Sequence, residues 1–245
     1  MVLESFPSTS PFQPHVATGL VALQPPDAET ALMPSQWQEL AAPQREKHLA
    51  LIRKHPGSPR RSFVRCPVSH SLEPFGAGWA LTTFSADIPT AALDTVAAIA
   101  LHGGSIRSGN FYPRSDGSLL FDAQFHGPTR KELEGIGETL LARFGGTPAG
   151  KRTPFLEEVR DLKIAGYTPE GSPYTALEVR AADTRGLLYR ILRAFVVLGI
   201  RVTRAEVNSA AGLAHDVFLL TDRKKMPLNA EREIPYIQRE ILAAK

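Results

Sequence analysis

A short polar loop between two apolar segments contains the residues best suited to binding chemistry. It consists of Asp183, Thr184, Arg185, Gly186 and Leu187. Apolar residues at helical spacing follow, so the backbone N–H groups of the loop would lie at a helix N-terminus. Such N–H groups favour a carboxylate, and a glycine lets a ligand approach the backbone. The loop therefore predicts a small-molecule site. The alternative is that Asp183 only caps the helix and Gly186 only permits the turn.

Catalytic signatures are absent from the sequence. It contains no Asp-x-Asp for a magnesium-bound triphosphate, no His-Glu-x-x-His, no Cys-x-x-Cys, no Gly-x-Ser-x-Gly and no P-loop. His215 and Asp216 are adjacent on an expected strand, so their side chains should point to opposite faces rather than share a metal. The single cysteine, Cys66, excludes an internal disulfide and is expected to be an inert small hydrophobe. We expect a protein that is not an enzyme and that needs no metal or cofactor.

Composition indicates an ordinary globular protein. The 245 residues are 43% hydrophobic and 22% charged, with a formal net charge of +3. This mild basicity does not by itself imply nucleic-acid binding. No apolar run reaches the length of a membrane span, and Glu4 with Pro25-Pro26 is unlike a signal peptide. The expectation is a cytoplasmic protein without membrane contact.

The elements around the polar loop follow a recognisable order. A strand is expected at 176–179, before the loop, and a helix at 187–198, after it. Gly199 is placed to end that helix. Strands at 200–208 and 213–221 complete a strand-helix-strand-strand unit.

The same order occurs earlier in the chain. Three landmarks pair across the halves, Asp87 with Asp183, Gly103 with Gly199 and Asp122 with Asp216, at separations of 96, 96 and 94 residues. A nearly constant separation indicates a duplicated unit. A helix at 129–144 follows the first copy, with Thr129 and Glu132 forming a capping-box pattern, and another at 230–244 follows the second. The fold class is therefore α+β, with two ferredoxin-like βαββα units.

Four regions are expected along the chain. Residues 1–34 are proline-rich and predict a flexible tail, and residues 35–60 predict a helical lead-in. The first unit takes 61–150 and the second 151–245. Each unit lacks the usual last strand. We expect segments 63–68 and 162–167 to fill that position in the first and second sheets.

These residues resemble a known family. The segment 182–188 is similar to the Asp-Arg-Pro-Gly-Leu-Leu turn of ACT domains, with Thr184-Arg185 in place of Arg-Pro. Val202-x-x-Ala205-x-Val207 and Asp216-Val217-Phe218 resemble the second and third strands of that family. Within it, residues 174–222 look most like the C-terminal ACT pair of protein-PII uridylyltransferases.

The resemblance implies a tandem ACT-domain protein that binds an amino acid or related effector between its units. By position, Asp183 would accept the ammonium group of the ligand, and the amides of Gly186 and Leu187 would face its carboxylate. In the first unit Thr90 stands where the glycine should be, so that loop is expected to be structural. The implied function is non-catalytic allosteric regulation through a protein partner or a homodimer.

Three alternatives stay open. The pair of units could be an interaction scaffold without a ligand, or a uridylyltransferase-related fragment without catalytic domains. It could also bind RNA, because ferredoxin-like sheets can do so. The arginines that could form a basic patch for RNA are Arg190, Arg193, Arg201 and Arg204. No Lys/Arg-Gly-Phe strand motif accompanies them, so solvated arginines are the preferred interpretation.

Overall fold

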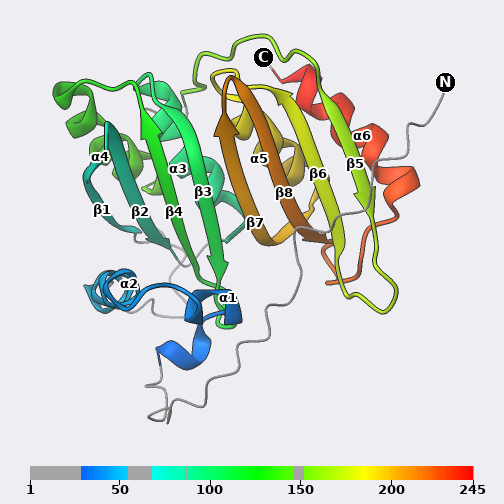
Figure 1. Ribbon diagram of the computed structural model, residues 1–245, viewed down its shortest axis with the longest axis horizontal. Coiled ribbons are helices and arrows are strands. Elements are labelled where there is room, and N and C mark those ends of the chain that lie inside the picture. Colours follow the sequence, from blue (N-terminus) through cyan, green and yellow to red (C-terminus); the bar gives the residue numbers. More distant parts are fainter. Residues whose placement is uncertain (1–28, 55–67, 86–87, 146–151, 245) are drawn as a thin grey trace.

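The protein folds around one eight-stranded antiparallel sheet (Figure 1). This computed structural model describes residues 29–54, 68–85, 88–145 and 152–244. The proline-rich residues 1–28, Cys66 and Asp87 lie outside these ranges. The strands are β1 (Val68–Phe75), β2 (Gly78–Ser85), β3 (Ser105–Pro113), β4 (Leu119–His126), β5 (Lys163–Tyr167), β6 (Thr175–Ala182), β7 (Arg201–Ala210) and β8 (Leu213–Thr221). The helices are the 3-10 turn η1 (Thr30–Leu32), α1 (Ser35–Gln38), α2 (Ala42–Lys54), α3 (Ile88–Leu101), α4 (Arg130–Phe144), α5 (Leu187–Leu198) and α6 (Ala230–Ala243).

The strand order β1-β2-β4-β3-β7-β8-β6-β5 divides the sheet into two halves of the same topology. This α+β architecture is compatible with two ferredoxin-like units, each a βαββα element preceded by one strand. The preceding strand lies beside β2 in the first half and beside β6 in the second. The expectation that 162–167 fills the fourth position of the second sheet is confirmed by β5. In the first sheet the position belongs to β1, and residues 63–67 of the expected segment lie outside the described ranges.

The two halves join through a short antiparallel ladder between β3 and β7. Its paired residues are Ser108 with Asn208, Gly109 with Val207 and Asn110 with Glu206. Helices α3 and α5 pack against each other across the same seam, and one apolar core runs through both halves. The inner sheet edges are therefore covered within the chain, as the exposed edges of strands require.

The strand registers correct one of the sequence landmarks. Thr83 of β2 pairs with Phe121 of β4, while Val179 of β6 pairs with Asp216 of β8. Because Thr83 and Val179 are equivalent at the 96-residue separation, Phe121 and not Asp122 is the counterpart of Asp216. A register difference of one residue turns a side chain to the other face of a sheet. Asp122 and Asp216 thus lie on opposite faces.

Short helices cover part of the face opposite α3 and α5. Helix α2 contacts β1 and β2, and α1 lies beside it at the end of the first half (Figure 1). The helical lead-in expected at 35–60 is observed as far as Lys54. A second apolar cluster holds it in place, formed by Met33, Trp37, Leu49, Leu51, Ile52, Phe84, Tyr112 and Leu120.

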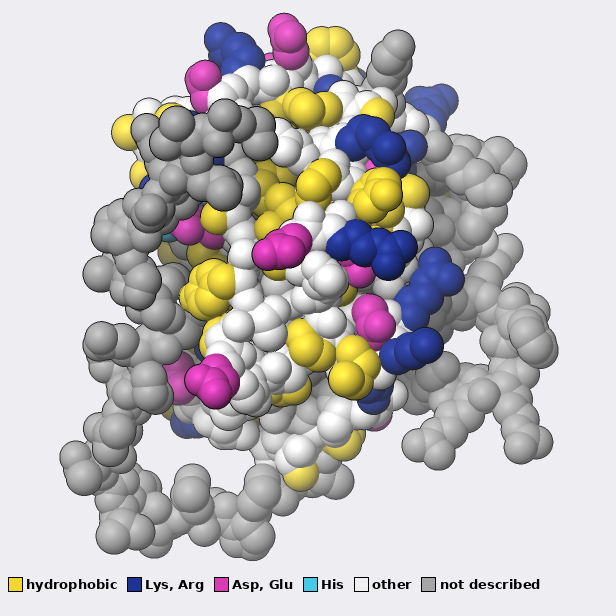
Figure 2. Space-filling view, turned by 90° about the vertical axis from the view of Figure 1, so that its right-hand side faces the viewer, with side chains coloured by type: hydrophobic (Ala, Val, Ile, Leu, Met, Phe, Trp, Pro, Cys, Tyr) yellow, Lys and Arg dark blue, Asp and Glu magenta, His cyan; other side chains and the backbone are white. Residues whose placement is uncertain are grey.

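The outer edge at β5 is short and carries charge. β5 has five residues and begins with the exposed Lys163. Seen from this side, Lys and Arg side chains gather along one margin, with acidic and apolar side chains between them (Figure 2). Short, charged edges discourage pairing with other strands. In the described part of the chain, no helix has the length and apolar composition needed to cross a membrane.

The capping box predicted at α4 is present. Thr129 accepts a hydrogen bond from the Glu132 backbone N–H, and the Glu132 carboxylate accepts one from the Thr129 N–H at 2.6 Å. We predict that Thr129→Ala lowers the free energy of unfolding by about 1 kcal/mol, because it leaves helix N–H groups without an acceptor. Urea unfolding measures this. Glu134→Ala, an exposed change in the same helix, is the control, and an equal loss there would contradict the prediction.

Candidate functional site

The predicted loop lies at the seam between the two units. It connects β6 to α5 and faces the end of α3 and the start of β3 from the other half. A cavity of about 30 Å³ lies between them. Of the five predicted site residues, Asp183, Thr184, Gly186 and Leu187 line this cavity, whereas Arg185 is exposed and does not. Side chains from both halves complete the lining, among them Val96, Ala100, Ile106, Tyr189, Val207, Ser209 and Asp216.

Backbone geometry explains the glycine in the loop. Gly186 is the N-cap of α5 and has φ +85°, a left-handed conformation that other residues rarely adopt. As a glycine, the N-cap residue has no side chain with which to cap the helix. The backbone amide of Asp183 donates to the Gly212 carbonyl at 2.9 Å. The loop is thereby attached to the β7–β8 turn.

The space left by the missing glycine side chain is filled. A Cβ built on Gly186 would lie 2.5 Å from Cδ2 of Leu156. The open approach for a ligand expected there is therefore occupied by an apolar side chain. Residues 152–161, which we call the strap, pass over the loop without forming a helix or a strand. The amide of Glu157 donates to the Arg185 carbonyl at 3.2 Å, and the Arg185 amide donates to the Glu157 carboxylate.

Arg190, in the first turn of α5, holds the strap against α6 by hydrogen bonds. Its buried guanidinium donates to the carbonyls of Glu157 (3.1 Å), Ile241 (3.3 Å) and Ala244. Arg204 pairs with Glu206 at 2.7 Å on β7. Two of the four arginines considered for an RNA-binding patch are thus committed to separate intramolecular contacts. Arg190 and Arg204 therefore do not form one basic surface.

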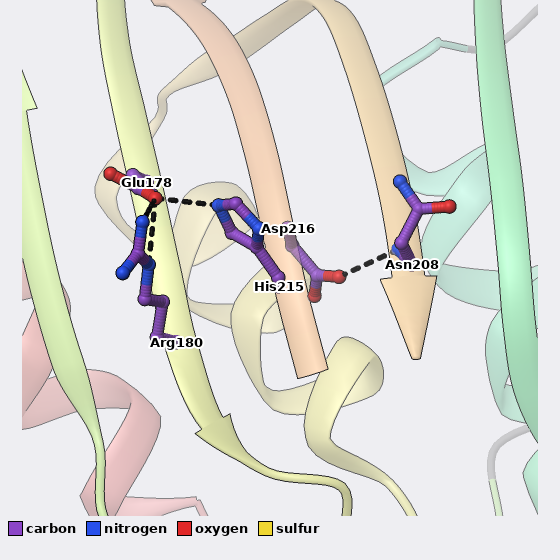
Figure 3. Close-up of polar contacts among 5 residues, drawn as sticks. All are labelled: Glu178, Arg180, Asn208, His215 and Asp216. Carbon is purple, nitrogen blue, oxygen red and sulfur yellow. Dashed lines mark hydrogen bonds and ion pairs between the residues drawn. The ribbon is translucent and has the colours of Figure 1, made fainter. Parts of the chain in front are cut away.

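Asp216 also lines the seam cavity, although it was not among the predicted site residues. It is 2% exposed, lies on β8 and turns toward the helix layer and the cavity. Its Oδ1 accepts a hydrogen bond from the Asn208 backbone N–H at 3.2 Å (Figure 3). Burial is the main cause that raises the pKa of the Asp216 carboxyl to about 7; the hydrogen bond from Asn208 lowers this pKa, and the nearby charge of Asp183 adds to the rise. The sequence signal for it was the alternation of β8, which placed Asp216 opposite His215.

The opposite face of the same strand has a different character. His215 contacts Glu178 of β6, which also pairs with Arg180, and all three lie on the open face (Figure 3). The expectation that His215 and Asp216 point to opposite faces is confirmed. Within the described ranges, no group of three or more His, Cys, Asp or Glu side chains is arranged to hold a metal ion.

Another polar atom at the cavity lacks a partner. Thr184 is 5% exposed, and its buried Oγ1 makes no hydrogen bond within the described structure. Leaving a buried hydroxyl unsatisfied costs about 1–3 kcal/mol. The cavity therefore combines a buried carboxyl, a second carboxyl at Asp183 and an unpaired hydroxyl beside a helix N-terminus. These groups can bind a small molecule that donates and accepts hydrogen bonds.

The equivalent cavity on the other side of the seam is apolar. It has a volume of about 60 Å³ and lies between the start of α3 and the start of β7. Thr90, the residue that stands in the first unit where the second has Gly186, lies in α3. The lining carries mostly hydrocarbon side chains, namely Ala92, Leu93, Phe111, Leu119, Leu192, Phe195, Val196, Ile200, Arg201 and Val202. Among the residues that the structure describes, carboxyl groups thus line only the first of these two related cavities.

Comparison with known proteins gives one consistent similarity. No family model matches the chain. A bifunctional uridylyltransferase/uridylyl-removing enzyme of Bradyrhizobium sp. (strain ORS 278) is 26% identical over 214 residues, 80% of this chain and 22% of the relative. The enzyme of the same name from Methylococcus capsulatus is 33% identical over 80 residues, 33% of this chain and 9% of the relative. The chain spans at most about a fifth of the length of these curated relatives.

The matches among solved structures include a shell protein. A trimeric shell protein from the RMM microcompartment aligns over 76% of this chain at 14% identity and a TM-score of 0.25. A score this low supports no conclusion about fold or function. The uridylyltransferase similarity is therefore the finding that bears on this chain.

The raised pKa of Asp216 predicts a pH dependence of stability. The unfolded chain loses this proton near pH 3.8 and the folded chain near pH 7, so the stability contributed by Asp216 falls between these values as pH rises. We predict that Asp216→Asn removes this fall and gains up to about 4 kcal/mol relative to wild type between pH 4 and pH 8. Chemical denaturation across that range measures it. Glu170→Gln, an exposed carboxylate change, should keep the wild-type slope, and an unchanged slope in Asp216→Asn would contradict the assignment.

The contact between Gly186 and Leu156 predicts a steric coupling. Gly186→Ala should lose more stability than Gly171→Ala, because both glycines have positive φ but no atom lies within 4 Å of a Cβ at Gly171. We expect about 1 kcal/mol for the backbone strain alone and a larger loss at Gly186. The double variant with Leu156→Ala should lose less than the sum of the single losses. Additive losses in unfolding experiments would show that the strap does not press on the loop.

Proposed function

We propose that the chain is a non-catalytic regulatory protein whose two ACT-like units bind an amino acid or a related small effector at the carboxyl-lined seam cavity. The observation that carries this proposal is the asymmetry of the two seam cavities. One is lined, among the described residues, mostly by hydrocarbon, as packing alone requires. The other holds Asp216 at a position where the first unit has Phe121. Burying a carboxyl group is unfavourable, and such perturbed groups gather at functional sites.

The roles of the cavity residues follow from their chemistry. Asp183 and Asp216 would accept hydrogen bonds from an ammonium group, and the N-terminus of α5 would face a carboxylate. Deprotonation of Asp216 would become favourable beside a bound cation, because an opposite charge stabilises the ionised form. The buried hydroxyl of Thr184 would gain a partner.

The size of the cavity makes binding a conformational event. A volume of about 30 Å³ is far smaller than an amino acid requires. An effector would therefore displace Leu156 and the strap, or widen the seam between α3 and α5. A ligand that binds only the opened arrangement shifts the population toward it, and a partner protein could respond to that difference. The strap also connects the first unit to β5, the first strand of the second unit. Its displacement would therefore change the contacts between the two units.

One observation favours a second candidate. Leu156 already fills the space beside Gly186, which suits a ligand-free scaffold whose units pair only to present a surface to another protein. Similarity to uridylyltransferase/uridylyl-removing enzymes over 80% of the chain is compatible with both candidates. Transfer of uridylyl groups by this chain is not part of either, and measured transfer from UTP would overturn the non-catalytic assignment.

The two candidates differ in a thermal-shift experiment with the twenty amino acids. The sensing proposal predicts that at least one amino acid raises the Tm in a saturable manner. Asp183→Asn should reduce that response about tenfold or more in apparent affinity, since a charged hydrogen bond is worth about 1.5–3 kcal/mol.

Glu170→Gln is the matched control, because it removes an exposed carboxylate remote from the seam. It should respond as the wild type does. Unchanged melting curves with all twenty compounds would favour the ligand-free scaffold, and an equal response of wild type and Asp183→Asn would remove the loop from the site.

A further inference from the structure

The open face of the first unit has a second polar hollow. It has a volume of about 410 Å³ and lies between α2 and strands β2, β3 and β4. The seam cavity is on the other face of the sheet, so the two are independent. We call this hollow the α2 groove. Its polar lining comprises Gln44, Lys47, His48, Glu73, Thr82, Ser108, Asn110, Asp122 and Gln124.

A chain of hydrogen bonds fixes the floor of the α2 groove. The indole N–H of Trp37 donates to Nδ1 of His48 at 3.0 Å, and Nε2 of His48 lies 2.8 Å from Oδ2 of Asp122. Indole nitrogen can only donate, so Nδ1 must be the acceptor and Nε2 must carry the proton. His48 is 1% exposed and both ring nitrogens are engaged. It therefore acts as a support that orients Asp122 and is not available as a catalytic base.

One carboxylate oxygen of Asp122 lacks a hydrogen-bond partner among the described residues. The other oxygen, Oδ2, accepts a hydrogen bond from Nε2 of His48 and one from the side-chain amide of Gln44 at 3.3 Å. Oδ1 is buried and makes no hydrogen bond within the described structure. A buried carboxylate oxygen without a donor is costly and calls for a missing partner. Asn110 and Thr82 are its cross-strand neighbours on the same face of the sheet.

The charge of the groove selects the kind of partner. Lys47 and Glu73 form an ion pair at the rim and offset each other. Among the described residues that line the groove, Asp122 is then the remaining charged group, which favours a cation. Oδ2 already has two partners and Oδ1 alone lacks a donor within the described structure, which disfavours a guanidinium that pairs with both oxygens and suits an ammonium with three separate donors. Phe75, 51% exposed, provides an apolar wall for a methylene chain.

We propose that the α2 groove is a binding site for a small primary ammonium compound with a short apolar stem, held by Asp122 with help from Asn110 and Thr82. The second unit does not repeat this site. At the equivalent position of β8, one residue after Asp216, stands Val217, which cannot accept a hydrogen bond. The groove therefore depends on the helices that precede the two units, and it is not a property of the duplicated fold.

Calorimetric titration with n-butylamine, n-butylguanidine and 1-butanol tests the proposal. We expect saturable binding of the amine and at least about tenfold weaker binding of the other two. In ¹⁵N NMR spectra the indole N–H of Trp37 should shift with the amine, because it is linked to Asp122 through His48. Asp122→Asn should weaken amine binding about tenfold or more while retaining an acceptor for His48.

Three further variants make the result decisive. Asn110→Leu keeps the Trp37–His48–Asp122 chain and should also weaken the amine, which separates recognition from folding if Asp122→Asn is unstable. Glu134→Ala and Glu170→Gln, which change exposed carboxylates, should bind as the wild type does, whatever the outcome of the amino-acid experiment. Absence of saturable amine binding, equal binding by Asp122→Asn, or preference for the guanidine would overturn the proposal.

Discussion

The ladder between β3 and β7 is the constraint on which the arrangement of both sites depends. Three residue pairs join two four-stranded halves into one sheet, and this places α3 against α5 on one face. The loop of the second unit then meets the first unit at the start of β3. Without that pairing, Asp183 and Gly186 would face solvent and the seam cavity would not exist. The pairing also covers two strand edges that would otherwise expose unpaired backbone groups.

A register difference of one residue decides which face each carboxylate occupies. Phe121 and Asp122 in β4 correspond to Asp216 and Val217 in β8. In the second unit Asp216 points into the core, where burial removes its carboxyl from solvent and raises its pKa to about 7. In the first unit the acid turns outward and lies under α2, where His48 supports it. The duplicated fold therefore carries two dissimilar polar sites at nearly the same strand position.

The strap and Arg190 couple the loop to the end of the chain. Leu156 rests on Gly186, and Arg190 ties the strap to the last turn of α6 through three carbonyls. Hydrogen bonds from a charged group are among the stronger ones in proteins. The arrangement explains why the loop is closed in this structure. It also gives a physical path by which movement of the loop would reach α6.

The sequence by itself determined the local elements and their duplication. Apolar spacing gave α5, Gly199 marked its end, and Thr129 with Glu132 marked the start of α4, because these signals depend on neighbouring residues only. The strand that completes the second sheet was also foreseen at 162–167. The filled space at Gly186, the inward turn of Asp216 and the support of Asp122 by His48 required the tertiary structure. They depend on Leu156 and Gly186 (30 positions apart), Val179 and Asp216 (37) and His48 and Asp122 (74), and strand register across such distances is fixed by packing, not by local pattern.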